Sequence, residues 1–301
     1  MLVSEYRYYE FVAVDRPLDD RQRAEVRALS SRARLTDTAF VDEYEEGDFP
    51  GDPVRMVERY YDAHVYLTNE GTRRFVLRLP KHVLAVDTVE EYCLDGHMAA
   101  WTSGGNLVLE LTSEDEEDEE DREPQGWLPA ILGIRAELAA GDLRPLYLAW
   151  LAGYGTWERD EWAFDRAHDD EPEPSVPPGL NELTTPQREL ADFLRLDEDL
   201  LHVAASASPP LASAADDPHA LVSWIAGLPV EEKDRLLVRV AGDEAAVVRM
   251  ELLHRFRGGS VDRPIEAKVR TVADLLDGAG RYRTEREHRE VGDRTAEPEK
   301  V

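Results

Sequence analysis

Apolar and polar positions alternate over residues 1–112 in short runs that turn-forming residues separate. Tyr, Phe and Val are dense over 5–14, as a buried strand requires, and a second strand is expected over 38–44. Two hairpins are predicted where Gly71 and the pair Gly104-Gly105 interrupt apolar runs. The pattern therefore predicts a sheet in which hairpins are frequent.

Two helices are predicted between these strands. Asp19 can cap the first helix, and Asp52, followed by Pro53, can cap the second. Strands that alternate with helices and then continue as hairpins indicate an α+β fold, with a mixed or antiparallel sheet and two helices on one face. We expect this arrangement to be ferredoxin-like in part.

The composition changes after residue 112. Residues 113–125 are expected to form an acidic linker, because nine of the ten residues from 114 to 123 are carboxylates and cannot pack. Helical periodicity then predicts an all-α C-terminal domain over 126–280, with an irregular acidic segment at about 158–178. A polar tail is predicted over 281–301.

The clearest helix start in this C-terminal part is Thr185-Pro186, interpreted as the N-cap and the first helical residue. Leu190, Phe193 and Leu194 follow at helical spacing and form one apolar stripe. Such stripes predict helices that pack through a single face.

The net charge of the chain limits the classes of molecule that it is expected to bind. The chain has 64 acidic and 35 basic residues, which leaves a net charge of −29 at pH 7. A surface of this sign repels phosphate backbones and anionic lipids, so direct binding to nucleic acids or membranes is not expected. Basic proteins and metal ions are favoured instead.

Several absences predict a cytoplasmic protein. Cys93 is the single cysteine, so an internal disulfide and a cysteine-only zinc site are excluded. The N-terminus lacks the basic and apolar regions of a signal peptide. The most apolar run, 143–154, is shorter than the ~20 residues that cross a bilayer.

Chemistry-bearing motifs are scarce, and the best candidate is a possible zinc site. Cys93 and His97 have three residues between them, and His82 lies eleven residues before Cys93. Thiolate and imidazole are zinc ligands, so these three residues are candidates for a metal-dependent hydrolase. A Cys-His nucleophile pair oriented by Asp95 is another option. The simpler interpretation is that Cys93 packs in the core beside a turn, with no cofactor.

Two acidic segments are candidates for partner binding. Tryptophans beside carboxylates can anchor a basic segment, and a dense acidic run can grip arginines or imitate a DNA phosphate track. The alternatives are core packing for the aromatic residues and a solvated linker for the acidic run. The candidate residues are Trp157, Glu161, Trp162 and Asp165 in the first segment and Glu116, Glu117, Asp118 and Glu119 in the second.

Three stretches carry a resemblance to other proteins: EYRYYEFVAVDRPL, GDPVRMVERYYDAHVYLTNEGTRRFVLRLP and GDLRPLYLAWL. Together they make the chain similar to a family of uncharacterised bacterial proteins. Those proteins continue with a helix rich in Ala, Arg and Glu, so the resemblance implies a shortened or divergent tail over 281–301. It implies no activity and no site residue.

The sequence therefore favours a non-catalytic role. The main hypothesis is a soluble accessory or scaffolding protein that binds a basic protein partner. The alternatives are a metal-dependent hydrolase that uses His82, Cys93 and His97, and an inhibitor that mimics DNA.

Overall fold

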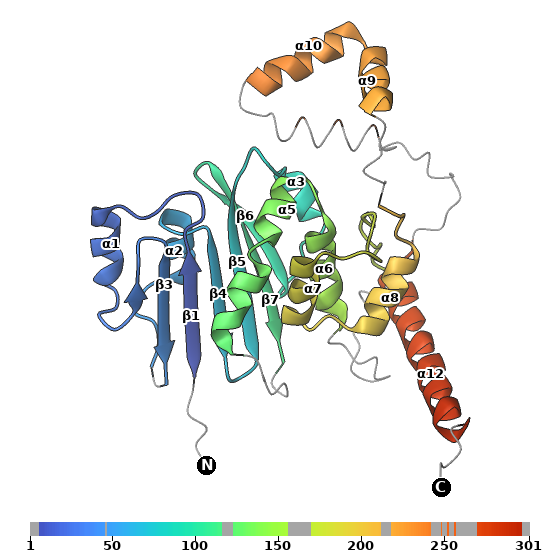
Figure 1. Ribbon diagram of the computed structural model, residues 1–301, viewed down its shortest axis with the longest axis horizontal. Helices are drawn as coiled ribbons and strands as arrows, with labels where there is room; N and C mark the ends of the chain where they lie inside the picture. Colours follow the sequence, from blue (N-terminus) through green and yellow to red (C-terminus); the bar gives the residue numbers. More distant parts are fainter. Residues whose placement is uncertain are drawn as a thin grey trace.

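A computed structural model describes residues 6–45, 47–115, 123–155, 170–211, 218–241, 248, 252, 256 and 270–296. A seven-stranded antiparallel sheet forms the N-terminal half, and most of the helices follow it (Figure 1). The predicted α+β class is therefore confirmed. None of the described helices has the length and apolarity that crossing a membrane requires.

Every neighbouring pair of strands in the sheet is antiparallel. The order across the sheet is β2-β3-β1-β4-β5-β7-β6. The strands are β1 (Arg7–Val12), β2 (Arg34–Leu35), β3 (Ala39–Tyr44), β4 (Ala63–Thr68), β5 (Thr72–Pro80), β6 (Met98–Ser103) and β7 (Asn106–Glu114).

Two of the three helix starts named above are placed as predicted. Asp19 caps α1 (Asp20–Arg27) in a capping box with Gln22, and Asp52 caps α2 (Pro53–Arg59). The third prediction is one residue off, because Thr184 rather than Thr185 caps α7. The other helices are α3 (Val86–Glu90), α4 (Trp127–Ile131), α5 (Ile134–Ala139), α6 (Arg144–Gly155), α7 (Thr185–Phe193), α8 (Glu198–Ser206), α9 (Pro218–Gly227), α10 (Val230–Arg239) and α12 (Val272–Ala296), with a short 3-10 helix at Pro124–Gly126.

The first part of the chain has a ferredoxin-like arrangement, as expected. Its elements run β1-α1-β2-β3-α2-β4, and the strands lie in the order β4-β1-β3-β2. The two-residue strand β2 was not predicted. Strands β5, β7 and β6 extend the sheet beyond β4.

Successive side chains of each strand point to opposite faces of the sheet, and each face packs into a core of its own. On one face, α1 and α2 cover a smaller core that contains Val26, Met56 and Val57 from the helices and Phe11 and Phe40 from the strands. Both predicted helices therefore lie on one face.

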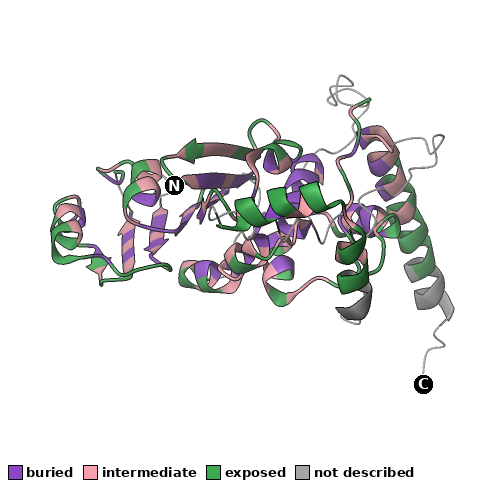
Figure 2. Ribbon diagram, turned by 90° about the horizontal axis from the view of Figure 1, so that it is seen from above, coloured by how far each residue is buried: buried purple, intermediate pink, exposed green. Residues whose placement is uncertain are grey.

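The other face of the sheet packs against the helices that follow it. Phe193 of α7 contacts both Phe75 of β5, at 6.3 Å between ring centroids, and Trp127 of α4, at 5.2 Å. Strand β7 continues to Glu114, two residues past the predicted end of the α+β part. The sheet and the helices after it thus share one large core, and buried residues are concentrated there in Figure 2.

His64 lies in the smaller core as a neutral imidazole. Its ring stacks on Phe11 with 3.9 Å between centroids, and its Nδ1–H donates to the Glu10 carbonyl oxygen at 2.9 Å. Nε2 is buried and has no hydrogen-bond partner among the described residues. Burial lowers the pKa of His64 to about 3, because the core cannot solvate an imidazolium.

The chain should lose stability in mild acid because of His64. In the unfolded chain this histidine has a pKa of about 6.5, so below that pH the unfolded state takes up a proton that the folded state rejects. The free energy of unfolding should fall by about 2 kcal/mol from about pH 7 to about pH 5 through this residue. Urea unfolding at both pH values should show a smaller fall for His64→Phe. An exposed-site control, His82→Gln, should behave like the wild type. Equal losses in wild type and His64→Phe would exclude His64 as the cause.

Candidate functional site

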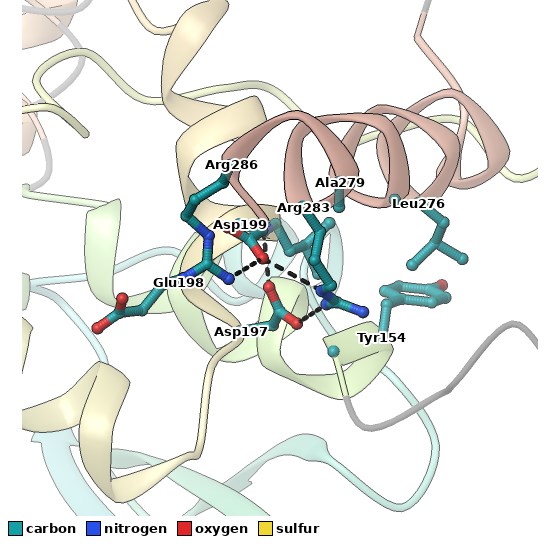
Figure 3. Close-up of a pocket in the computed structure, with 11 residues that line it drawn as sticks. Tyr154, Asp197, Glu198, Asp199, Leu276, Ala279, Arg283 and Arg286 are labelled. Carbon is teal, nitrogen blue, oxygen red and sulfur yellow. Dashed lines mark hydrogen bonds and ion pairs between the residues drawn. The ribbon is translucent and has the colours of Figure 1, made fainter. Parts of the chain in front are cut away.

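A pocket of about 500 Å³ lies where the end of α6, the first turn of α8 and the helix α12 meet (Figure 3). Carboxylates, arginines and a tyrosine share its lining with small and apolar residues, and we call it the acidic pocket. Its lining residues are Tyr154, Gly155, Asp197, Glu198, Asp199, Leu200, Leu276, Ala279, Gly280, Arg283 and Arg286.

The start of α8 brings three consecutive carboxylates to the acidic pocket. Asp197 is the N-cap, and its side chain accepts a hydrogen bond from the backbone N–H of Leu200 at 2.9 Å. Glu198 and Asp199 follow in the first helical turn. The helix dipole stabilises negative charge at this end, so the local fold supports three anionic side chains in one turn.

Two arginines of α12 bind these carboxylates. Arg283 forms an ion pair with Asp197, and its Nε donates to Oδ2 of Asp199 at 3.1 Å. Arg286 Nη2 donates to the same Oδ2 at 2.9 Å. The hydrogen bond with Asp199, followed by the charge of Asp197, raises the pKa of Arg283. The pocket therefore already holds two guanidinium groups in good geometry.

Glu198 is the carboxylate of this turn that these arginines leave open. It is exposed, and no hydrogen bond or ion pair joins it to another residue of the described part of the chain. Figure 3 shows its side chain directed away from the ion pairs. Three carboxylates against two guanidinium groups leave an excess negative charge, which favours a cationic ligand.

An aromatic side chain forms the other end of the acidic pocket. The ring of Tyr154 lies near Leu276 in Figure 3, and its hydroxyl donates to Oε2 of Glu171 at 2.7 Å. Burial, then the bond to Glu171, raises the pKa of Tyr154, so the phenol stays neutral. An apolar ring beside carboxylates suits the stem and head of an arginine or lysine side chain.

The partner-binding residues predicted from the sequence lie outside the described residues. Trp157, Glu161, Trp162 and Asp165 belong to 156–169, and Glu116, Glu117, Asp118 and Glu119 belong to 116–122. Gly155 lines the pocket, and residue 156 follows it directly.

The predicted zinc ligands do not come together. Among the described residues, no group of three or more His, Cys, Asp or Glu side chains could hold a metal ion. His82 is exposed in the turn after β5, whereas His97 lies against α6, where a Cβ on Gly153 would come within 3.0 Å of His97 Cγ. The structure therefore does not assemble His82, Cys93 and His97 into a metal site.

Cys93 has the environment of a packing residue. Its Sγ donates to the Val89 carbonyl oxygen at 3.6 Å, and burial, then the charge of Glu90, raises the pKa of the thiol. A zinc ligand or a nucleophile needs the thiolate, which this environment disfavours. Burial also lowers the pKa of His97.

Sequence reasoning missed the residues of the acidic pocket. The signal for Asp197, Glu198 and Asp199 was present as three consecutive acidic residues before an apolar pair. The arginines that face them are 84 to 87 residues away in the chain, and no local pattern connects them. Comparisons of the chain with models of protein families, with curated proteins and with solved structures found no significant match.

Proposed function

We propose that this chain binds a basic segment of a partner protein through the acidic pocket, as an accessory or scaffolding protein of the cytoplasm. The observation that carries the proposal is the first turn of α8, where Asp197 and Asp199 accept guanidinium groups beside an aromatic ring.

The net charge of −29 supports this function by acting at longer range. A strongly negative chain attracts cationic segments before contact and accelerates their association. Salt screens such attraction over a Debye length of about 10 Å at 0.1 M ionic strength. A complex of this kind should therefore weaken steeply as salt rises.

Replacing Glu198 by glutamine should weaken the binding of a basic peptide. The probe is a short fluorescent peptide rich in arginine, and its anisotropy is titrated with the full chain at low and at high salt. An exposed ion pair is worth at most about 1 kcal/mol, so the variant should bind about 2- to 5-fold more weakly at low salt. The difference should shrink at high salt.

Two controls separate this effect from general electrostatics. Glu70→Gln removes the same charge from the exposed turn between β4 and β5 and should leave affinity unchanged. The same peptide with glutamine in place of arginine should not bind. If the arginine peptide fails to bind the wild-type chain at low salt, the proposed function is wrong.

The hypothesis that the chain mimics DNA predicts that the chain competes with DNA for the same binding protein. A mimic would occupy the basic groove of a DNA-binding protein, so DNA and this chain would exclude one another from that protein. Binding of an arginine-rich peptide that is free of any DNA-binding fold would favour the accessory role. Competition with DNA for a folded DNA-binding protein would favour the mimic.

A further inference from the structure

Helix α12 is attached to the molecule along one side and over only part of its length. Val272, Leu275 and Ala279 are buried, whereas residues 283–289 are all exposed. Its main contacts among the described helices and strands are with α8. Figure 2 shows the helix changing from mostly half-buried to exposed toward the C-terminus.

The contact between α12 and α8 depends on a glycine. A Cβ on Gly278 would come within 2.8 Å of Val203 Cγ1, so the two helices approach closely only because this position has no side chain. His202 of α8 stacks on Tyr282 at 3.9 Å between ring centroids. Close packing therefore holds the side of α12 that faces α8.

On the side of the acidic pocket, α12 is less well packed. Five of the lining residues belong to this helix: Leu276, Ala279, Gly280, Arg283 and Arg286. A Cβ added to Gly280 would meet no atom within 4 Å, so the helix borders open space there. Here α12 is held by the ion pairs of Arg283 and Arg286, whose side chains are each 44% exposed, whereas the Asp199 carboxylate that they share is 6% exposed. Because the arginine side of each pair is open to solvent, salt screens these pairs more than it screens fully buried pairs.

We propose that α12 is a displaceable lid of the acidic pocket, whose arginines occupy the carboxylates that a basic partner would otherwise bind. The inference rests on the proposed function for its partner, but the motion of the lid can be tested without one. Displacing α12 frees Asp197 and Asp199, which Arg283 now bridges. A partner that brings its own guanidinium groups replaces those of α12 with little loss of electrostatic energy.

Hydrogen exchange of α12 in the full chain tests the lid directly. In Arg283→Gln/Arg286→Gln, amides over 275–288 should exchange about 10-fold faster than in the wild type, because the helix opens more often. The control Arg281→Gln/Arg289→Gln removes the same charge from the same helix. Among the described residues, Arg289 bonds to the Glu285 carbonyl oxygen and lies over the Tyr282 ring, both within α12, so exchange should stay as in the wild type.

A second variant displaces the lid without changing the charge of the acidic pocket. Gly278→Val places a side chain against Val203 and should push α12 away from α8. Unchanged exchange in β4 and β5 verifies that the rest of the chain is folded. The arginine-rich peptide should bind both lid variants at least about 3-fold more tightly than the wild type, since its competitor has been removed.

The outcomes separate the two proposals. If α12 exchanges at the wild-type rate in both lid variants, or if the peptide binds the wild type and binds the lid variants no more tightly, α12 is not a lid. If hydrogen exchange of α12 accelerates in the lid variants while the peptide binds neither these variants nor the wild type, the proposed function is wrong and the mobile lid stands.

Discussion

Replacing Glu173 by glutamine is expected to lower the free energy of unfolding by about 3 to 5 kcal/mol, because it breaks a buried ion pair. The Glu173 carboxylate is 5% exposed, and it accepts hydrogen bonds at 2.6 Å from both Nε and Nη2 of Arg270. The hydroxyl of Tyr147 donates to the same carboxylate. Glutamine would leave the guanidinium of Arg270 without its counter-ion.

Through Arg270, the buried ion pair with Glu173 links separate parts of the chain. Its Nη1 also donates to the Val203 carbonyl oxygen at 2.9 Å, near the end of α8. Urea unfolding measures the loss, and Glu70→Gln at an exposed turn should change stability by less than about 0.5 kcal/mol. The double variant Glu173→Gln/Arg270→Gln should cost less than the sum of the single changes. If Glu173→Gln costs no more than Glu70→Gln, the buried pair does not stabilise the fold.

Replacing Asp62 by asparagine should cost a similar amount, about 3 to 5 kcal/mol at neutral pH. The buried Asp62 carboxylate accepts hydrogen bonds from the backbone N–H groups of Val14 and Asp15 at 2.7 and 2.9 Å. It also accepts two from the Arg78 guanidinium, at 3.1 and 2.7 Å. An amide group in that place turns an N–H toward one of these donors and leaves Arg78 without its charge partner.

The pH dependence identifies the Asp62 contribution. Burial alone would raise the pKa of Asp62, but the hydrogen bonds from Asp15, Arg78 and Val14 outweigh it and lower the pKa. A lowered pKa in the folded state means that the stabilisation is present above the unfolded value and is lost as pH falls through the folded value. The wild type should therefore lose this part of its stability below about pH 4, a more acidic window than that of His64. Asp62→Asn should lack that loss, which acid unfolding monitored by circular dichroism can measure. An unchanged acid transition in the variant would contradict this assignment.

Local chemistry was enough to predict several elements of the fold. Asp19 and Asp52 precede helices because a short acceptor side chain satisfies a free N–H of the first turn, and both caps are present. Gly71 takes a φ of +88° between β4 and β5, as the hairpin prediction requires. These features depend on neighbours within a few residues, so the sequence contains the information they need.

Other features of the sheet depend on distant partners. Strand β2 has only two residues and forms because β3 offers it an edge, so its own residues carry no strand pattern. Arg135 of α5 is an example, because its Nη2 donates to Asp15 Oδ2 at 2.7 Å across 120 residues of chain. No periodicity predicts such a contact.

The sequence by itself determined the fold class, three helix starts to within one residue and the acidic character of the chain, because hydrophobic periodicity, capping and charge are local or additive properties. Only the tertiary structure decided which charged residues meet. It did not assemble His82, Cys93 and His97 into a metal-binding group, and it brought the carboxylates at the start of α8 to the arginines of α12. A functional site requires its side chains to lie at short distances from one another. For residues that are far apart in the sequence, only tertiary packing sets those distances.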